Sequence, residues 1–192
     1  MNLPNKLTVL RVLMIPVFVA LYFASGIPHN YLWALIVFAA AAITDMLDGQ
    51  IARKYGLITD FGALMDPLAD KLLVMSAMLC FIHGDLVHAA IVVVLLSREF
   101  MVTSIRTVAA SKGTVISADR WGKLKTVLQM LWICLGLLLL WIVNWLGIPV
   151  DNYRLFFDLL QIFDILTWIV LAVTALSGLN YLVKNRQLFA DK

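Results

Sequence analysis

The chain is organised as six long blocks of apolar residues separated by short polar stretches. A helix needs about 20 predominantly apolar residues to cross the hydrocarbon core of a bilayer, and each block has roughly that length. Because only helices and closed barrels satisfy their backbone groups in lipid, each block predicts one membrane-spanning α-helix. The predicted spans are Leu7–Ala24, Tyr31–Ile43 continuing to Asp45, Gly62–His83, Leu86–Ala110, Trp121–Trp145 and Phe156–Val183.

Composition supports a membrane protein. Hydrophobic residues make up 62% of the 192 residues, and the mean hydropathy is +0.93, whereas apolar residues make up about 45–50% of soluble domains. The sequence contains no linker, low-complexity tract, internal repeat or soluble domain. We therefore expect one all-α domain over residues 1–192, an integral membrane bundle of six transmembrane helices.

Lysine and arginine are distributed unequally between the two sides of the predicted bundle. Of 15 such residues, only Arg154 falls near the connections after the first, third and fifth spans. Cytoplasmic loops carry an excess of these residues, so both termini are predicted to be cytoplasmic. The net charge of +3 favours anionic lipid headgroups, and we expect no nucleic-acid partner. The cations that flank the other connections are Arg53, Lys54, Lys112, Arg120, Lys184 and Arg186.

One stretch carries a density of acids that is unusual for a membrane chain. It runs from Asp45 to Asp70 and reads DMLDGQIARKYGLITDFGALMDPLAD. An unpaired charge at membrane depth costs between about 2.5 and 17 kcal/mol, depending on how well water relieves it. The regularly spaced acids of this stretch therefore need cations. They are Asp45, Asp48, Asp66 and Asp70.

The spacing of these acids predicts two polar helix faces. Residues three or four apart lie on one face of a helix. If the segment Tyr55–Phe61 reverses the chain, the two faces can meet, and Asp60 in that segment is placed to cap a helix. The first face contains Asp45, Asp48, Gly49 and Ala52, with Arg53 one turn beyond Gly49, and the second contains Gly62, Asp66 and Asp70.

The chemistry of these faces suits divalent metal ions and a phosphate-bearing ligand. Clustered carboxylates repel one another unless cations neutralise them. Oxygen ligands favour hard ions, so Mg²⁺ or Mn²⁺ is expected. Gly49, Ala52 and Gly62 leave the faces open to a bulky ligand, and Arg53 is placed to hold a phosphate.

The same stretch carries a family resemblance. It fits the pattern D-x2-D-G-x2-A-R-x8-G-x3-D-x3-D at all eight specified positions over 26 residues. In this it resembles the signature of the CDP-alcohol phosphotransferase family. The resemblance implies a six-helix membrane enzyme, usually a homodimer, that joins an alcohol to the phosphatidyl group of CDP-diacylglycerol, or of another CDP-linked donor, and releases CMP.

Carried over position by position, the resemblance also implies residue roles. Asp70 would be the general base. Because no activated Ser, Cys or His accompanies the acids, we expect direct in-line attack by the alcohol, without a covalent enzyme intermediate. The residues that would bind two metal ions are Asp45, Asp48, Asp66 and Asp70. Those that would line the pocket for cytidine and the diphosphate are Gly49, Ala52, Arg53 and Gly62.

Cations outside the signature point to a phosphorylated acceptor. Arg106, Lys123 and Lys125 lie where the fourth and fifth helices meet a cytoplasmic loop. A second phosphate fits such cations better than serine or free inositol does. Alternatively, these residues contact lipid headgroups, while Arg98 and Glu99 either form a structural pair or line the pocket. The whole set of cations is Lys71, Arg98, Arg106, Arg120, Lys123 and Lys125.

Four further stretches extend the resemblance over most of the chain. They resemble the bacterial members of the family that transfer the phosphatidyl group to sn-glycerol 3-phosphate, which implies a bacterial cytoplasmic-membrane enzyme with its site facing the cytoplasm. Relatives that use inositol phosphate share much of this pattern, so the acceptor stays open between glycerol 3-phosphate, inositol phosphate, serine and phosphatidylglycerol. The stretches are NLPNKLTVLRVLMIPVF, DPLADK around Asp66, SREF at Ser97–Phe100 and WGKLKTVLQM at Trp121–Met130.

A cation-coupled transporter is the competing hypothesis from a different class of membrane protein. It would also keep acids in the membrane, typically on helices broken near the bilayer midplane. Here the acids gather at one margin of the predicted bundle, with small residues and an arginine between them. That arrangement favours a site for a nucleotide diphosphate.

Other polar and aromatic residues have less specific interpretations. Asn5, Thr8 and Arg11 begin the first helix and are expected to touch donor phosphate or lipid headgroups. Asp164 is expected to be solvated at the external interface, and Asp158 to pair with Arg154. Tryptophans are expected to face lipid or anchor the interface rather than stack on cytidine, above all Trp132, Trp141, Trp145 and Trp168.

Overall fold

The computed structural model describes residues 3–55, 60–111, 113, 120–147 and 153–186, and within these the side chains other than those of 3–4, 46–55, 60–61, 63–64, 120 and 153–156. The described chain is helical throughout, apart from turns, and contains no strand. The predicted all-α fold with six helices is therefore confirmed. The helices are α1 (Leu3–Phe23), α2 (Asn30–Tyr55), α3 (Asp60–His83), α4 (Ala89–Ser111), α5 (Arg120–Trp145) and α6 (Tyr153–Lys184).

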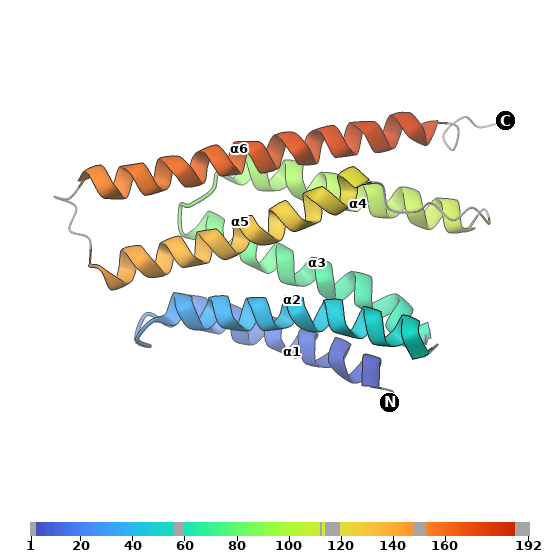
Figure 1. The fold of residues 1–192 in the computed structure, drawn as a ribbon, viewed down its shortest axis with the longest axis horizontal. Coiled ribbons are helices and arrows are strands. Elements are labelled where there is room, and N and C mark those ends of the chain that lie inside the picture. Colours follow the sequence, from blue (N-terminus) through green and yellow to red (C-terminus); the bar gives the residue numbers. More distant parts are fainter. Residues whose placement is uncertain (1–2, 56–59, 112, 114–119, 148–152, 187–192) are drawn as a thin grey trace.

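The helices run roughly along one long axis (Figure 1). α1 and α2 pack against each other on one side of the bundle, α4 and α6 pack on the other, and α3 and α5 lie between these pairs. α2 ends and α3 begins at the end of the bundle where α1 begins and α6 ends. This topology carries the acidic stretch to one end of the bundle.

Three helices are long and apolar enough to cross a membrane on the residues described: Asn5–Phe23 in α1, Trp121–Leu146 in α5 and Phe157–Lys184 in α6. The apolar segment described in α2, Asn30–Asp45, is shorter. Large apolar side chains on the outside are typical of a lipid-facing surface, and Leu13 is 60% exposed. These features identify a membrane protein, and the crossing of all six helices stays a prediction.

The turn between α3 and α4 shows why the predicted start of the fourth helix is three residues early. The amide of Leu86 donates to the Phe81 carbonyl at 3.0 Å, and that of Asp85 donates to the Ile82 carbonyl at 3.2 Å. With Asp85 at a φ of 52°, these bonds form the Schellman motif that ends many helices. Leu86 is buried in the core beside this cap. Its apolar side chain therefore reads as part of the fourth apolar block, although α4 begins only at Ala89.

The apolar core is centred on three aromatic rings from three helices. Trp132 on α5 stacks on Phe163 on α6 at 5.7 Å between ring centroids, and Phe81 on α3 meets the Trp132 ring edge-on at 5.5 Å. Trp132 Nε1 donates to Thr167 Oγ1 at 2.8 Å. Trp132 is fully buried, so its predicted lipid-facing role is wrong. Hydropathy averaged over the block hid the buried face, which Trp132 shares with Lys125 and Gln129.

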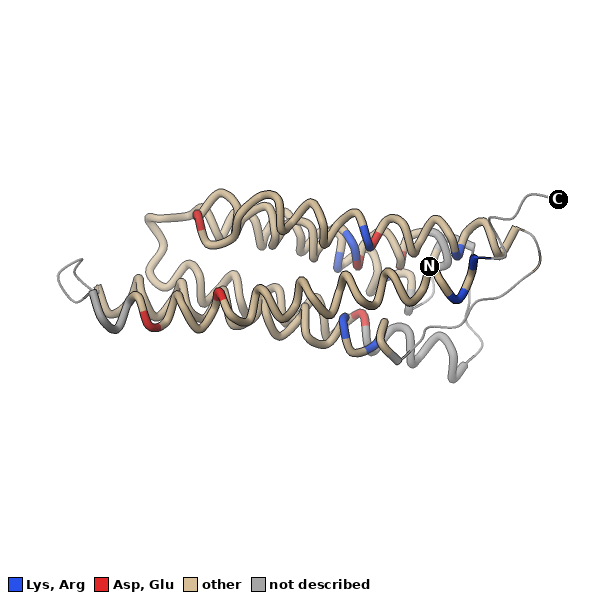
Figure 2. The backbone as a smooth tube through the Cα atoms, turned by 90° about the horizontal axis from the view of Figure 1, so that it is seen from above, with Lys and Arg blue, Asp and Glu red and all other residues tan. Residues whose placement is uncertain are grey.

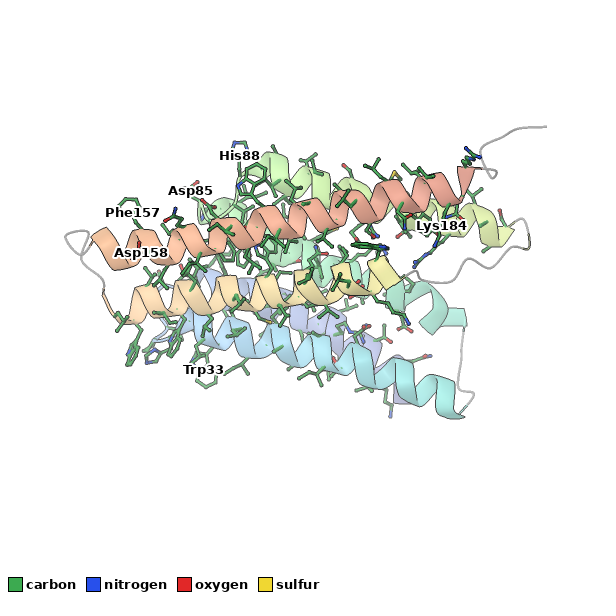
Figure 3. The ribbon with its side chains drawn as sticks, turned by 45° about the horizontal axis from the view of Figure 1, so that its top comes forward. Trp33, Asp85, His88, Phe157, Asp158 and Lys184 are labelled. Atoms are coloured by element: carbon green, nitrogen blue, oxygen red, sulfur yellow. The ribbon has the colours of Figure 1, made fainter. Side chains whose placement is uncertain are left out.

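Charge is distributed unequally along the bundle. The described lysines and arginines gather in the half where α1 begins and α6 ends (Figure 2). Asp85, His88 and Asp158 lie toward the other end from Lys184 (Figure 3). Asp158 and Asp164 are both exposed, while Arg154, the predicted partner of Asp158, lies outside the described side chains. The asymmetry follows the pattern that the sequence predicted for the two sides of the membrane.

Candidate functional site

We call the end of the bundle that carries the signature carboxylates Asp45, Asp66 and Asp70 the acidic margin. A buried arginine joins it to α1. Arg11 Nη1 lies 2.7 Å from Asp45 Oδ1. The Arg11 side chain is 0% exposed and that of Asp45 is 40% exposed. A guanidinium buried within a membrane bundle requires an acidic partner, because an isolated charge there is strongly unfavourable. Asp45 supplies that partner while part of its carboxylate remains accessible.

A second contact ties α1 to the acid-bearing face of α3. Thr8 Oγ1 donates to Asp66 Oδ1 at 2.6 Å, and Thr8 is 1% exposed. Thr8 and Arg11 are three residues apart and so share one face of α1. The sequence assigned these two residues to donor phosphate or lipid headgroups. The structure instead places both against signature carboxylates.

Asp70 lies one helical turn after Asp66 on α3 and is partly buried. It interacts electrostatically with Asp45, Lys71, Glu99 and Arg11. Asp45 in turn interacts with Asp66. Three signature carboxylates have described side chains, and they come from two helices. They therefore lie close enough for their charges to interact.

The remaining signature positions lie on the same two helices. Gly62 is on α3, four residues before Asp66, and is buried. The other four are in the second half of α2, at positions whose side chains the structure does not describe: Asp48, Gly49, Ala52 and Arg53. Asp48 and Gly49 follow Asp45 by three and four residues, so their backbone positions lie on the face of α2 that carries Asp45.

The donor set has the chemistry of a hard-metal site. Three of the four predicted ligands are described, and all of them are carboxylates, the donors preferred by Mg²⁺ and Mn²⁺. Each contact with α1 engages the Oδ1 atom of a carboxylate, at Asp45 and at Asp66. Among the described side chains, no group of three or more His, Cys, Asp or Glu converges closely enough to hold a metal ion. The carboxylates are therefore the right type of ligand for Mg²⁺ or Mn²⁺, and the side chain of the fourth predicted ligand, Asp48, is not among those described.

A pocket adjoins Asp70 between α3, α4 and α5. It holds about 440 Å³ of space, part of it open to solvent. The side chains that line it divide into a polar group and an apolar group. The polar group is Asp70, Lys71, Glu99, Lys125, Thr126 and Gln129, and the apolar group is Val74, Met75, Leu96, Phe100 and Met130. A small polar ligand in this pocket would lie directly beside Asp70.

Glu99 is the centre of a charged network at this pocket. Its Oε1 atom accepts from Arg98 Nη1 at 3.0 Å and also from Lys125 Nζ. Arg98 Nη2 donates to Ser177 Oγ on α6 at 2.7 Å. The side chains of Lys125 and Arg98 are only 4% and 10% exposed. Glu99 therefore both forms a structural pair and lines the pocket, whereas Arg98 forms the pair but is not among the residues that line the pocket.

The other predicted acceptor-binding cations are placed differently. Arg106 is partly buried, with its guanidinium carbon 5.6 Å from the centroid of the Tyr181 ring. Lys123 is exposed on the first turn of α5. Lys123 and Lys125 are two residues apart, so their side chains do not face the same side of the helix. The structure thus joins Arg98 and Lys125 through Glu99, while the helix directs Lys123 elsewhere.

Sequence reasoning missed Ser177 and Gln129 at this end of the bundle, and it named Thr8 without its partner Asp66. The contacts of Ser177 with Arg98 and of Thr8 with Asp66 join residues 79 and 58 positions apart. Gln129 lines the pocket and is 2% exposed. An amide within the apolar run from Val127 to Cys134 was a signal for Gln129, whereas nothing local marked the partners of Ser177 or Thr8.

Comparisons with known proteins agree over most of the chain. The family described as CDP-alcohol phosphatidyltransferase matches residues 1–153. A CDP-diacylglycerol–glycerol-3-phosphate 3-phosphatidyltransferase of Bacillus subtilis is 38% identical over 96% of this chain and 95% of its own length. One of Rickettsia typhi is 37% identical over 94% of each chain. A probable phosphatidylglycerophosphate synthase of Mycobacterium tuberculosis is 44% identical over 72% of this chain and 66% of its own.

Proposed function

Because the chain belongs to the CDP-alcohol phosphatidyltransferase family, we propose that it transfers the phosphatidyl group of CDP-diacylglycerol to sn-glycerol 3-phosphate. The products are phosphatidylglycerophosphate and CMP. The observation that carries this proposal is the likeness to relatives of that named activity along nearly their whole length. Support from the fold comes from an acidic margin and a cation-bearing pocket that share Asp70.

The acidic margin is the donor site in this proposal. Two Mg²⁺ or Mn²⁺ ions would supply charge neutralisation at the diphosphate and at the departing CMP. Arg53 holds a phosphate oxygen, and the small residues admit the nucleotide. The proposed metal ligands are Asp45, Asp48, Asp66 and Asp70, and the other proposed donor-binding residues are Gly49, Ala52, Arg53 and Gly62.

Asp70 is the proposed general base. It lies at the boundary between the acidic margin and the pocket, so a hydroxyl in the pocket reaches it directly. As the hydroxyl oxygen forms its bond to the lipid-side phosphorus, its proton moves to the Asp70 carboxylate. The bond from that phosphorus to the CMP oxygen breaks, and CMP leaves with the electron pair. General-base catalysis of this kind contributes about 10²–10⁴-fold in rate.

The pocket beside Asp70 is the proposed acceptor site. Arg98 and Lys125 bring two positive charges against the single negative charge of Glu99, which leaves a net positive charge for a phosphate. Lys123 and Arg106 add positive charge along the approach from the end of the bundle where α6 ends. A phosphorylated alcohol fits this balance better than serine, glycerol or phosphatidylglycerol, and inositol phosphate is its nearest competitor.

The proposed setting is the cytoplasmic membrane of a bacterium. The lysine- and arginine-rich end of the bundle faces the cytoplasm, according to the positive-inside tendency. The acidic margin and the pocket then open toward the compartment that supplies soluble acceptor. We also propose that the protein is a homodimer, as the family resemblance implies.

The test is release of CMP from CDP-diacylglycerol by purified protein in lipid nanodiscs. With Mg²⁺ present, CMP is expected only when glycerol 3-phosphate is added. Excess EDTA is expected to stop the reaction, and added Mg²⁺ or Mn²⁺ to restore it. CMP release that does not depend on an alcohol would identify a hydrolase, and full turnover in EDTA would contradict the metal assignment.

A further inference from the structure

The first helix lies outside the signature, yet it contacts two of the signature carboxylates. We propose that Thr8 and Arg11 are positioning residues for the metal site, each fixing the orientation of one carboxylate ligand. This inference rests on the proposed function, because it assumes that Asp45 and Asp66 bind divalent ions. It adds two α1 residues to the set that determines metal affinity.

The geometry of α1 supports this role. Thr8 and Arg11 are one turn apart on the same face of one helix. Thr8 contacts Asp66 on α3, and Arg11 contacts Asp45 on α2, at 2.6 Å and 2.7 Å. A single rigid element therefore holds carboxylates that come from two different helices. The relative position of those carboxylates therefore depends on α1 as well as on α2 and α3.

Burial keeps water out of both contacts, of which that of Thr8 with Asp66 is a directional hydrogen bond and that of Arg11 with Asp45 is a close ion pair. Thr8 and Arg11 are 1% and 0% exposed, so water does not compete for their donors, and the surrounding core restricts their rotamers. Asp45, in contrast, is 40% exposed on its side chain. One oxygen of the carboxylate is held from the buried side while the group stays accessible from the other. Partners that hold a metal ligand in this way are typically worth about 10–100-fold in metal affinity or activity.

Two substitutions test the orientation without changing the charge of the site. Thr8→Val removes the hydroxyl and keeps the shape of the side chain. Arg11→Lys keeps the positive charge but loses the planar guanidinium that fixes its partner. Thr44→Val is the matched control, because Thr44 precedes Asp45 directly and its hydroxyl donates to the Ala41 carbonyl of its own helix at 2.7 Å.

Mn²⁺ binding is measured by electron paramagnetic resonance of free Mn²⁺, with full-length protein in nanodiscs and no substrate. Thr8→Val and Arg11→Lys are expected to weaken Mn²⁺ binding by about 10-fold or more, and Thr44→Val to leave it within about 2-fold. Thermal unfolding in EDTA provides the second reading. Thr8→Val is expected to unfold near the wild-type temperature in EDTA but to gain less stability from Mn²⁺, which a merely structural role does not predict.

The outcomes separate this inference from the proposed function. Wild-type Mn²⁺ affinity in Thr8→Val overturns it, as does an equal loss in Thr44→Val. If Arg11→Lys does not fold, Thr8→Val alone decides. A wild-type protein that binds no Mn²⁺ refutes the metal assignment and this inference together, whereas wild-type binding with unaffected variants overturns only the role of α1.

Discussion

The two halves of this bundle are held together by different interactions. In the half that carries the acidic margin, helices are joined by charged or hydrogen-bonded pairs, such as Arg11 with Asp45 and Glu99 with Lys125. In the other half, they are joined by aromatic packing around Trp132 and its stacked neighbour Phe163 and by uncharged hydrogen bonds, such as that of Trp132 Nε1 to Thr167 Oγ1. The first half thus depends on buried charges, and the second on close packing with uncharged hydrogen bonds.

This difference separates function from stability. Buried ion pairs contribute little net stability, because desolvation offsets much of their attraction. Their concentration at one end therefore indicates a site that needs fixed charges, while van der Waals packing of the aromatic cluster contributes to helix association in the membrane. Substitutions at the acidic end should change binding and turnover, and substitutions at the aromatic cluster should change the free energy of unfolding.

The largest effect is expected from Asp70→Asn. An amide keeps the size of the carboxylate but cannot accept the proton of the acceptor hydroxyl, so turnover should fall by about 10²–10⁴-fold. The variant should still fold, with thermal unfolding close to wild type, and should still bind the donor. Steady-state CMP release and a melting curve on the same preparation check this, and turnover within a few-fold of wild type would remove Asp70 as the base.

Glu99→Gln should have the next largest effect. Without the negative charge, Lys125 and Arg98 lose the group that holds them at the pocket. Charge-assisted hydrogen bonds are worth about 1.5–3 kcal/mol, so the loss of fixed positions for Lys125 and Arg98 should outweigh the added positive charge of the pocket, and the KM for glycerol 3-phosphate should rise about tenfold or more. The KM for CDP-diacylglycerol should change much less. An equal rise for both substrates would assign Glu99 to general structure rather than to acceptor binding.

Gly136→Ala tests the aromatic half. A Cβ atom at this position would lie 2.6 Å from Phe81 Cζ and 3.0 Å from Phe163 Cε2. Overpacking of this kind typically costs about 1–3 kcal/mol, so the thermal midpoint should fall. The KM values of the folded protein should be unchanged. A changed KM for glycerol 3-phosphate, with no loss of stability, would show that the two halves are not separate.

The smallest effect is expected from a matched pair of glycines beside Arg98. A Cβ atom on Gly178 would lie 2.9 Å from Arg98 Cγ, whereas one on Gly122 would lie 4.0 Å from Arg98 Nη2. Gly178→Ala should therefore displace Arg98 and raise the KM for glycerol 3-phosphate a few-fold. Gly122→Ala should behave like wild type. Equal KM values for the two variants would argue that the placement of Arg98 does not matter to the acceptor.

Much of this architecture could be predicted from sequence because its determinants are local. Blocks of apolar residues locate helices, and the acids from Asp45 to Asp70 follow helical spacing within 26 positions. The predicted reversal, Tyr55–Phe61, agrees closely with an α2 that ends at Tyr55 and an α3 that begins at Asp60. The apolar blocks thus predicted the fold class, while the metal-ligand set suggested by the spacing of the acids stays a prediction.

The remaining features depend on contacts between distant segments. Trp132 shares a face of α5 with the buried polar residues Lys125 and Gln129, a sign that hydropathy averaged over the whole helix did not resolve. Leu86 extended an apolar block although it belongs to a cap rather than to α4. The partners of Thr8 and Arg11 lie on other helices, so only the assembled bundle shows that α1 takes part in the acidic site.

The most direct test of the whole account is an acceptor panel. Purified protein, CDP-diacylglycerol and Mg²⁺ are combined separately with glycerol 3-phosphate, inositol 3-phosphate, serine, glycerol and phosphatidylglycerol, and the lipid products are identified by mass spectrometry. We predict phosphatidylglycerophosphate from the first acceptor and little product from the others. Equal or greater product from another acceptor would contradict the assignment of glycerol 3-phosphate, and no lipid product from any acceptor would contradict phosphatidyl transfer itself.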